Sequence, residues 1–249
     1  VVGGPRWRAG REVGVDEEPA DILDQLLLAS CTEVAGIGGV WKPRVGAPNP
    51  PVFFFSDDDI LINHDTTFTP FPAIDDTYNA IHATYPNPKE LSQPKDAPPR
   101  YNADWEASDD HRRRIAELTL SACPYPTQAQ RVMHAYIEEE RRFRRHVITL
   151  PPDADALEPL IDTVSWTSAE NGYVSKLFEV CEAVSDPDTL AITVSLRERD
   201  PEDYDWQPGF ELPESAAPVT PYEPGNLIAD DFTAEGIALL DASGQPRRA

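Results

Sequence analysis

Residues 172–201, GYVSKLFEVCEAVSDPDTLAITVSLRERDP, decide the fold class of this chain. The second half of the stretch alternates apolar and polar side chains with a period of two, Leu190, Ile192, Val194 and Leu196 against Ala191, Thr193, Ser195 and Arg197. Such alternation is typical of a half-buried strand. Residues 185–188 (SDPD) carry turn-forming side chains. Strands 174–184 and 189–197 are therefore predicted to form an antiparallel hairpin.

Upstream of the hairpin, the sequence predicts a helix over residues 128–145. Thr127 and Gln130 match a capping box, and one face is apolar, with Ala129, Val132, Met133, Tyr136, Ile137 and Phe143. The helix would end in a cluster of cations, Arg141, Arg142, Arg144 and Arg145, which the helix dipole favours. Glu138 and Glu140 precede Arg142 and Arg144 by four residues, which indicates a solvated charged face. A patch for DNA or a partner is the alternative.

The remaining pattern predicts short strands and one more helix. The Leu face of residues 19–31 indicates an amphipathic helix, and residues 40–44 an edge strand interrupted by Pro43. Further strands are predicted at 52–55, 60–62, 79–85, 116–120, 146–150 and 162–167, with an acidic turn at 57–59 and an irregular Pro-rich excursion at 86–100. The fold class is α+β, mainly antiparallel β, with two packed helices.

Composition excludes several classes of function. The chain has 21 basic and 44 acidic residues, a net charge of −23, which disfavours a dedicated nucleic-acid binder. Cys31, Cys123 and Cys181 lie too far apart in sequence for a CxxC motif, and we expect them to be buried thiols. No apolar run reaches the roughly 20 residues of a membrane helix. The start, VVGG, lacks an initiator Met and a signal region, and this predicts a piece cut from a longer chain.

Signatures of catalysis and of metal binding are absent from the sequence. The five histidines (64, 82, 111, 134 and 146) form no HExxH or HxH arrangement. The acids at 57–59 with Asp65, and those at 75–76, lack the spacing of an EF-hand loop and are interpreted as solvated turns, although a glycosidase pair is the alternative. There is no GxSxG motif and no Gly-rich phosphate loop. We therefore expect no enzyme activity, no cofactor and no metal.

Three motifs in residues 18–206 resemble the hub region of siphophage tail-tip proteins, the lambda-type host-attachment family and its relatives in gene transfer agents. They are the helix end with its Pro-Pro turn, HVITLPPDADALEPLIDTVSW, the hairpin quoted above, and DPEDYDW at 200–206. The earlier stretches PADILDQLLLASCTEVAGIGGVWKPR and DDDILI are similar to the helix and hairpin that precede the hub barrel. At 160–162 this chain has Leu-Ile-Asp where relatives often have a Gly-Asp turn.

The resemblance implies small β-barrel-like domains that trimerise into a ring around the DNA channel at the tail tip of a virion. It implies a helix and hairpin segment at 1–75 (an insertion or first hub subdomain), a hub domain at 76–206, and a Pro-rich linker at 207–249 that starts a fibronectin-like module. Implied partners are further copies of the chain, the distal tail protein and the tape-measure C-terminus, with DNA passing without specific binding. The rival reading is a cell-wall hydrolase or peptidase-associated domain of the same tail tip.

The interface candidates are two aromatic residues and the arginine cluster. Tyr204 and Trp206 in DPEDYDW either anchor the end of the last strand on the core or lie at a subunit contact, because aromatic side chains serve both uses. Arg141, Arg142, Arg144 and Arg145 are the candidate cations. In a ring they are expected to point away from the channel, since fixed cations on its wall would hold DNA phosphates.

Overall fold

The structure is a computed structural model that describes residues 7–73 and 77–214. The chain divides into two compact units, Val1–Ser215 and Ala216–Ala249, and all described residues belong to the first. Most of the linker and fibronectin-like start expected at 207–249, and the acids at 75–76, lie outside the described residues.

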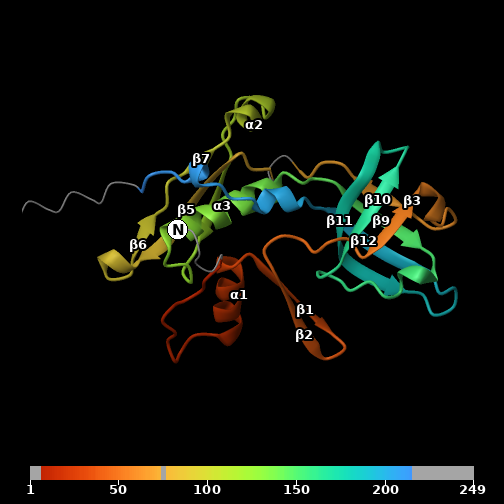
Figure 1. Ribbon diagram of the computed structural model, residues 1–249, viewed down its shortest axis with the longest axis horizontal. Coiled ribbons are helices and arrows are strands. Elements are labelled where there is room, and N and C mark those ends of the chain that lie inside the picture. Colours follow the sequence, from red (N-terminus) through yellow and green to blue (C-terminus); the bar gives the residue numbers. More distant parts are fainter. Residues whose placement is uncertain (1–6, 74–76, 215–249) are drawn as a thin grey trace, which may run out of the picture. The chain divides into compact units, whose positions relative to one another are not determined.

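The quoted stretch forms the middle of a six-stranded sheet (Figure 1). β11 (Tyr173–Ser185) pairs antiparallel with β12 (Ile192–Glu198), which confirms the predicted hairpin. The sheet order is β3-β10-β11-β12-β9-β4, with β3 at Phe53–Ser56, β10 at Thr163–Ser168, β9 at Arg145–Leu150 and β4 at Thr67–Thr69. Of the five neighbouring strand pairs in this order, β3–β10 is parallel and the other four are antiparallel. β3 and β4 are its edges, so the sheet is open rather than a closed barrel.

The buried face of this sheet is rich in aromatic rings. Ile192, Val194 and Leu196 on β12 are buried, as their alternation predicted. They pack in one cluster with Phe55, Trp166, Tyr173 and Phe178. Leu190 departs from the prediction, because it is exposed and has a φ of 59°. The strand begins at Ile192, three residues after the predicted start at residue 189.

A second sheet of four strands carries the longest helix. Its strands are β5 (Ala80–Asn87), β6 (Gln93–Asp96), β7 (Arg100–Tyr101) and β8 (Ile115–Thr119), and α3 (Pro126–Glu140) contacts β5 (Figure 1). The prediction that 86–100 is irregular was wrong. β6 pairs with β5 in that stretch, after the 3-10 turn η3 (Pro88–Glu90), because an edge strand tolerates a proline such as Pro94.

Two further predicted elements were also wrong in detail. Residues 60–62 are not a strand; they follow the 3-10 turn η1 (Asp57–Asp59), in which Ser56 and Asp59 form a reciprocal cap. α3 ends at Glu140, five residues before the predicted end, and Arg145 already belongs to β9. At 160–162, where relatives often have a Gly-Asp turn, Leu160 adopts the left-handed conformation itself, with a φ of 63°.

The N-terminal part contains α1 (Pro19–Ala29), which confirms the first predicted helix, and the antiparallel hairpin of β1 (Thr32–Ile37) and β2 (Val40–Val45). A short third helix, α2 (Ala103–Ser108), was not predicted. The remaining 3-10 turns are η4 (Pro152–Ala154), η5 (Pro201–Tyr204) and η6 (Pro208–Phe210). β3 and β4 precede residue 75 in the chain and belong to the same sheet as β9–β12.

The α+β class with mainly antiparallel strands is confirmed. Within the ranges 7–73 and 77–214, every helix is too short or too polar to cross a lipid bilayer.

Candidate interaction site

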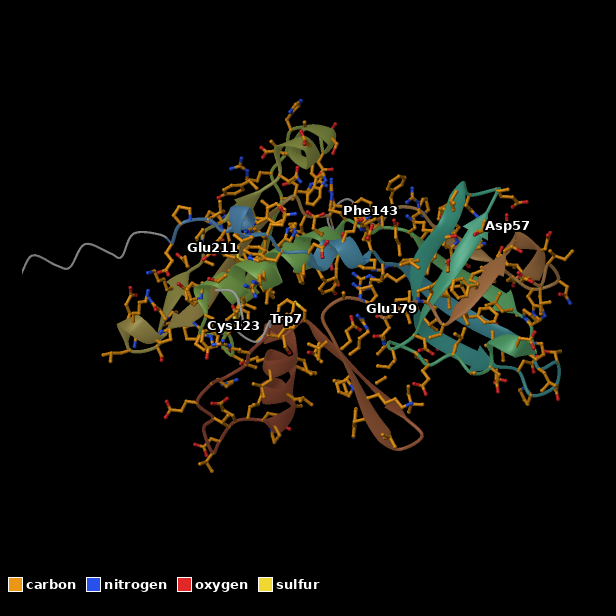
Figure 2. The ribbon with its side chains drawn as sticks, in the orientation of Figure 1. Trp7, Asp57, Cys123, Phe143, Glu179 and Glu211 are labelled. Atoms are coloured by element: carbon orange, nitrogen blue, oxygen red, sulfur yellow. The ribbon has the colours of Figure 1, made fainter. Side chains whose placement is uncertain are left out.

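A buried ion network joins strands of the six-stranded sheet to the N-terminal hairpin. Glu179 of β11 (labelled in Figure 2) is 2% exposed and lies between two guanidinium groups. Nε of Arg199 donates to its Oε2 at 2.7 Å, and Nη2 of Arg44 donates to its Oε1. Arg44 also donates to the carbonyls of Leu160 and Gly46. A carboxylate buried this deeply requires such partners, because desolvation of an unpaired charge costs several kcal/mol.

The network extends to two more glutamates. Arg199 Nη2 lies 2.9 Å from Oε1 of Glu33 on β1, and Nη1 lies 2.6 Å from Oε2 of Glu139 on α3. Burial opposes the charge of Arg199, but the carboxylates of Glu139 and Glu179 outweigh it and raise its pKa. Burial also raises the pKa of Glu139, and Arg199 acts against that shift. Three carboxylates therefore face two guanidinium groups.

Arg141 and Arg142 are held by internal carboxylates. Arg141 caps α3 and forms two hydrogen bonds with Asp109, at 3.0 and 3.3 Å. Burial works to raise the pKa of Asp109, but the hydrogen bonds from Arg141 and Asn79 outweigh it and the pKa falls. Arg142 donates through Nε to the buried Asp203 at 2.9 Å, and this bond raises its pKa. The predicted pairing of Arg142 with Glu138, four residues earlier, is therefore replaced by an ion pair with the distant Asp203.

Arg144 and Arg145 are more accessible. Arg144 Nη1 lies 3.3 Å from the buried Glu198, whose Oε1 also accepts from Lys176 at 2.6 Å. Arg145 is exposed on β9 and has no ion pair among the described residues. It lines a hollow of about 290 Å³ together with Arg142, Arg197, Glu140 and Phe143. The predicted cluster of four arginines is therefore split into three paired cations and one free cation within the described part of the chain.

The two aromatic candidates differ in burial. Tyr204 is buried at the end of η5, which favours its role as an anchor on the core. Trp206 is half-buried, with the guanidinium carbon of Arg100 4.9 Å from its ring centre and His134 edge-on at 6.1 Å. Desolvation lowers the pKa of His134, which favours a neutral imidazole in this cluster.

The acids and histidines considered for chemistry lie apart. Across residues 7–73 and 77–214, no three His, Cys, Asp or Glu side chains gather as metal ligands would. Asp57 accepts hydrogen bonds from Trp166 Nε1 at 3.1 Å and from the backbone N of Ala169 at 2.9 Å. His146 packs in the aromatic core, where its Nε2 lies 3.0 Å from the hydroxyl of Tyr173. Both residues hold the fold together.

Sequence reasoning missed the Glu179 network, although one signal for a buried acid was present. Glu198 continues the buried series of β12, two residues after Leu196, and it is 4% exposed. An acid in register with a buried apolar face must meet cations. The partners Arg44 and Glu33 come from more than 130 residues away, and no local pattern gives their position.

The fold is similar to that of a known virion protein. Over 78% of this chain and 42% of the other, it matches a protein of the virion of a native gene transfer agent particle, with a TM-score of 0.63 and 17% identity. Two tail proteins are more distant. A tail protein from Neisseria meningitidis MC58 matches over 75% of this chain and 56% of the other, with a TM-score of 0.47 and 12% identity. The 43 kDa tail protein of prophage MuSo2 from Shewanella oneidensis matches over 78% of this chain and 55% of the other, with a TM-score of 0.46 and 10% identity.

This chain spans less than half the length of the gene transfer agent protein. No protein-family model matches the sequence. Comparison with curated proteins also finds no match. The similarity at 17% identity therefore establishes a shared fold.

Proposed function

We propose that this chain is a structural, non-enzymatic protomer of a virion tail tip, in which three copies close a hub ring around the DNA channel. The ring would connect the tail tube, through a distal tail protein, to the receptor-binding apparatus and would contact the tape-measure C-terminus. The observation that carries the proposal is the fold shared with a protein of the gene transfer agent virion over 78% of the chain.

The sheet edges support an assembled state. Among the described residues, β3 and β4 each present one unpaired side of the six-stranded sheet, and exposed strand edges pair readily with another chain. Large apolar side chains are exposed on or beside these edges: Phe54 is 68% exposed on β3, and Phe71, after β4, is 71% exposed. Closed cyclic symmetry is the usual way for a protomer to cover such surfaces.

The net charge of −23 suits a channel through which DNA passes without binding. Anionic walls repel phosphates, over a range of roughly 8–10 Å at physiological salt, and so leave DNA mobile. Arg141 and Arg142, already neutralised by Asp109 and Asp203, add little attraction for phosphate. Arg145 should then face away from the channel or contact an acidic partner.

A reconstruction of the assembled particle by electron cryomicroscopy tests this function. We expect three copies of the chain around the tail axis, with acidic side chains at the channel and Arg145 outside it. A six-fold arrangement or a single copy would contradict the ring. Degradation of peptidoglycan by the purified chain, abolished by one Asp or Glu substitution, would favour a hydrolase instead.

A further inference from the structure

A small groove opens beside the buried ion network. It has a volume of about 140 Å³ and lies between α1, β1 and α3. Its walls are largely apolar, formed by Leu27, Leu28, Val132, Ala135 and Tyr136, with Cys31, Thr32 and Tyr204 beside them. Drug-sized ligands occupy pockets of roughly 300–1,000 Å³, so this groove has room for a single side chain.

One end of the groove carries excess negative charge. Glu33 and Glu139 both line it. Arg199 pairs with Oε2 of Glu139, but Oε1 of Glu139 is buried and has no hydrogen-bond partner within the described part of the chain. Glu33 pairs with Arg199 through Oε1, but its side chain as a whole is 35% exposed and so is accessible to a ligand. Arg197 also acts on Glu139 but is itself paired with Glu140. The three carboxylates of the network therefore exceed its two guanidinium groups by one charge, and a single cation would balance them.

We propose that this groove binds the side chain of a lysine on a partner protein, with the aliphatic stem between α1 and α3 and the ammonium between Glu33 and Glu139. Lysine combines an apolar stem with a compact, monovalent head that has three donors. Arginine presents five donors in a rigid fork, which the one unpartnered oxygen of Glu139 and the exposed Glu33 match less well. Binding of a lysine in this groove does not depend on the proposed assembly of the chain into a ring.

Binding of blocked amino acids to the full chain tests the proposal. The probes are Nα-acetyl-lysine N-methylamide, the matching norleucine derivative with the same stem and no charge, the arginine derivative, and methylammonium with the charge and no stem. Ligand-observed NMR titration gives each Kd. We expect the lysine probe to bind at least about tenfold more tightly than each of the other three, because only it satisfies both the walls and the carboxylates.

Substitutions locate the site. Glu139→Gln and Glu33→Gln should each weaken the lysine probe by about tenfold, while Glu170→Gln, an exposed acid in the six-stranded sheet region, should leave its Kd unchanged. Glu33→Gln keeps the test decisive if Glu139→Gln fails to fold, since Glu33 is partly exposed. Equal binding of lysine and norleucine probes, tighter binding of the arginine probe, or an equal loss in Glu170→Gln would overturn the proposal.

Discussion

The two sheets of the protein have cores of different kinds. The six-stranded sheet buries large rings, among them Trp166, Tyr173 and Phe178, whereas the core of α3 and β5 is rich in alanine, including Ala83, Ala116 and Ala129. Large rings fill the space between strands that come from distant parts of the chain. Small side chains let the helix backbone approach the sheet closely. The two regions should therefore respond to opposite changes in side-chain volume.

Removing a ring from the first core should have the largest effect. Phe178 is fully buried and contacts Trp166, Tyr173 and His146. Phe178→Ala would leave a cavity and should lower the free energy of unfolding by about 3–5 kcal/mol. Urea unfolding monitored by tryptophan fluorescence measures the loss. Phe54→Ala, on the exposed edge strand β3, is the control and should cost far less; similar losses would mean that Phe178 is not a core residue.

The aromatic core should also make stability depend on pH. Desolvation, with a smaller contribution from Arg144, lowers the pKa of His146 from 6.5 to about 4. The unfolded state takes up this proton at higher pH than the folded state does. The stabilisation from neutral His146 is therefore complete above pH 6.5 and is lost as the pH falls toward 4, by up to about 3 kcal/mol.

Unfolding of the wild type and of His146→Phe at pH 7 and pH 4.5 isolates this contribution. Burial raises the pKa of Glu138 and of Glu139, so these groups act in the opposite direction and must be cancelled by the comparison. The substituted protein keeps a ring against Phe68 and cannot titrate at this position. We expect a smaller loss of stability on acidification in His146→Phe; the same loss in both proteins would exclude His146 as the source.

The amino-acid sequence predicted the parts of both regions that depend on local pattern. Alternation found β12, the turn at 185–188 placed β11 beside it, and helical spacing found α1 and most of α3. It failed where partners come from far away: β6 pairs through a Pro-rich edge, and Glu179 meets Arg44 across 135 residues. The charged end of α3 was misjudged for the same reason, because Asp203 and Glu198 bind Arg142 and Arg144, which the local pattern had paired with Glu138 and Glu140.

An enlarged side chain should be harmful in the second core. Ala129 of α3 has no exposed surface. Ala129→Leu would force α3 away from its neighbours and should cost about 1–3 kcal/mol, although leucine is itself a good helix former. Thermal unfolding followed by circular dichroism gives the change. Ala107→Leu in α2, at an exposed position, is the matched control, and an equal destabilisation there would show that packing around Ala129 is not the cause.

The smallest effect is expected at Arg145, the first residue of β9 in the six-stranded sheet. Arg145→Gln removes an exposed cation that has no ion pair among the described residues, so the free energy of unfolding should change by less than about 0.5 kcal/mol. Arg142→Gln, in contrast, removes hydrogen bonds from the buried Asp203 and should cost about 1.5–3 kcal/mol. Urea midpoints of the two variants give the difference directly. Equal midpoints would mean that Arg142 is as solvated as Arg145 and that the ion pair with Asp203 contributes nothing to stability.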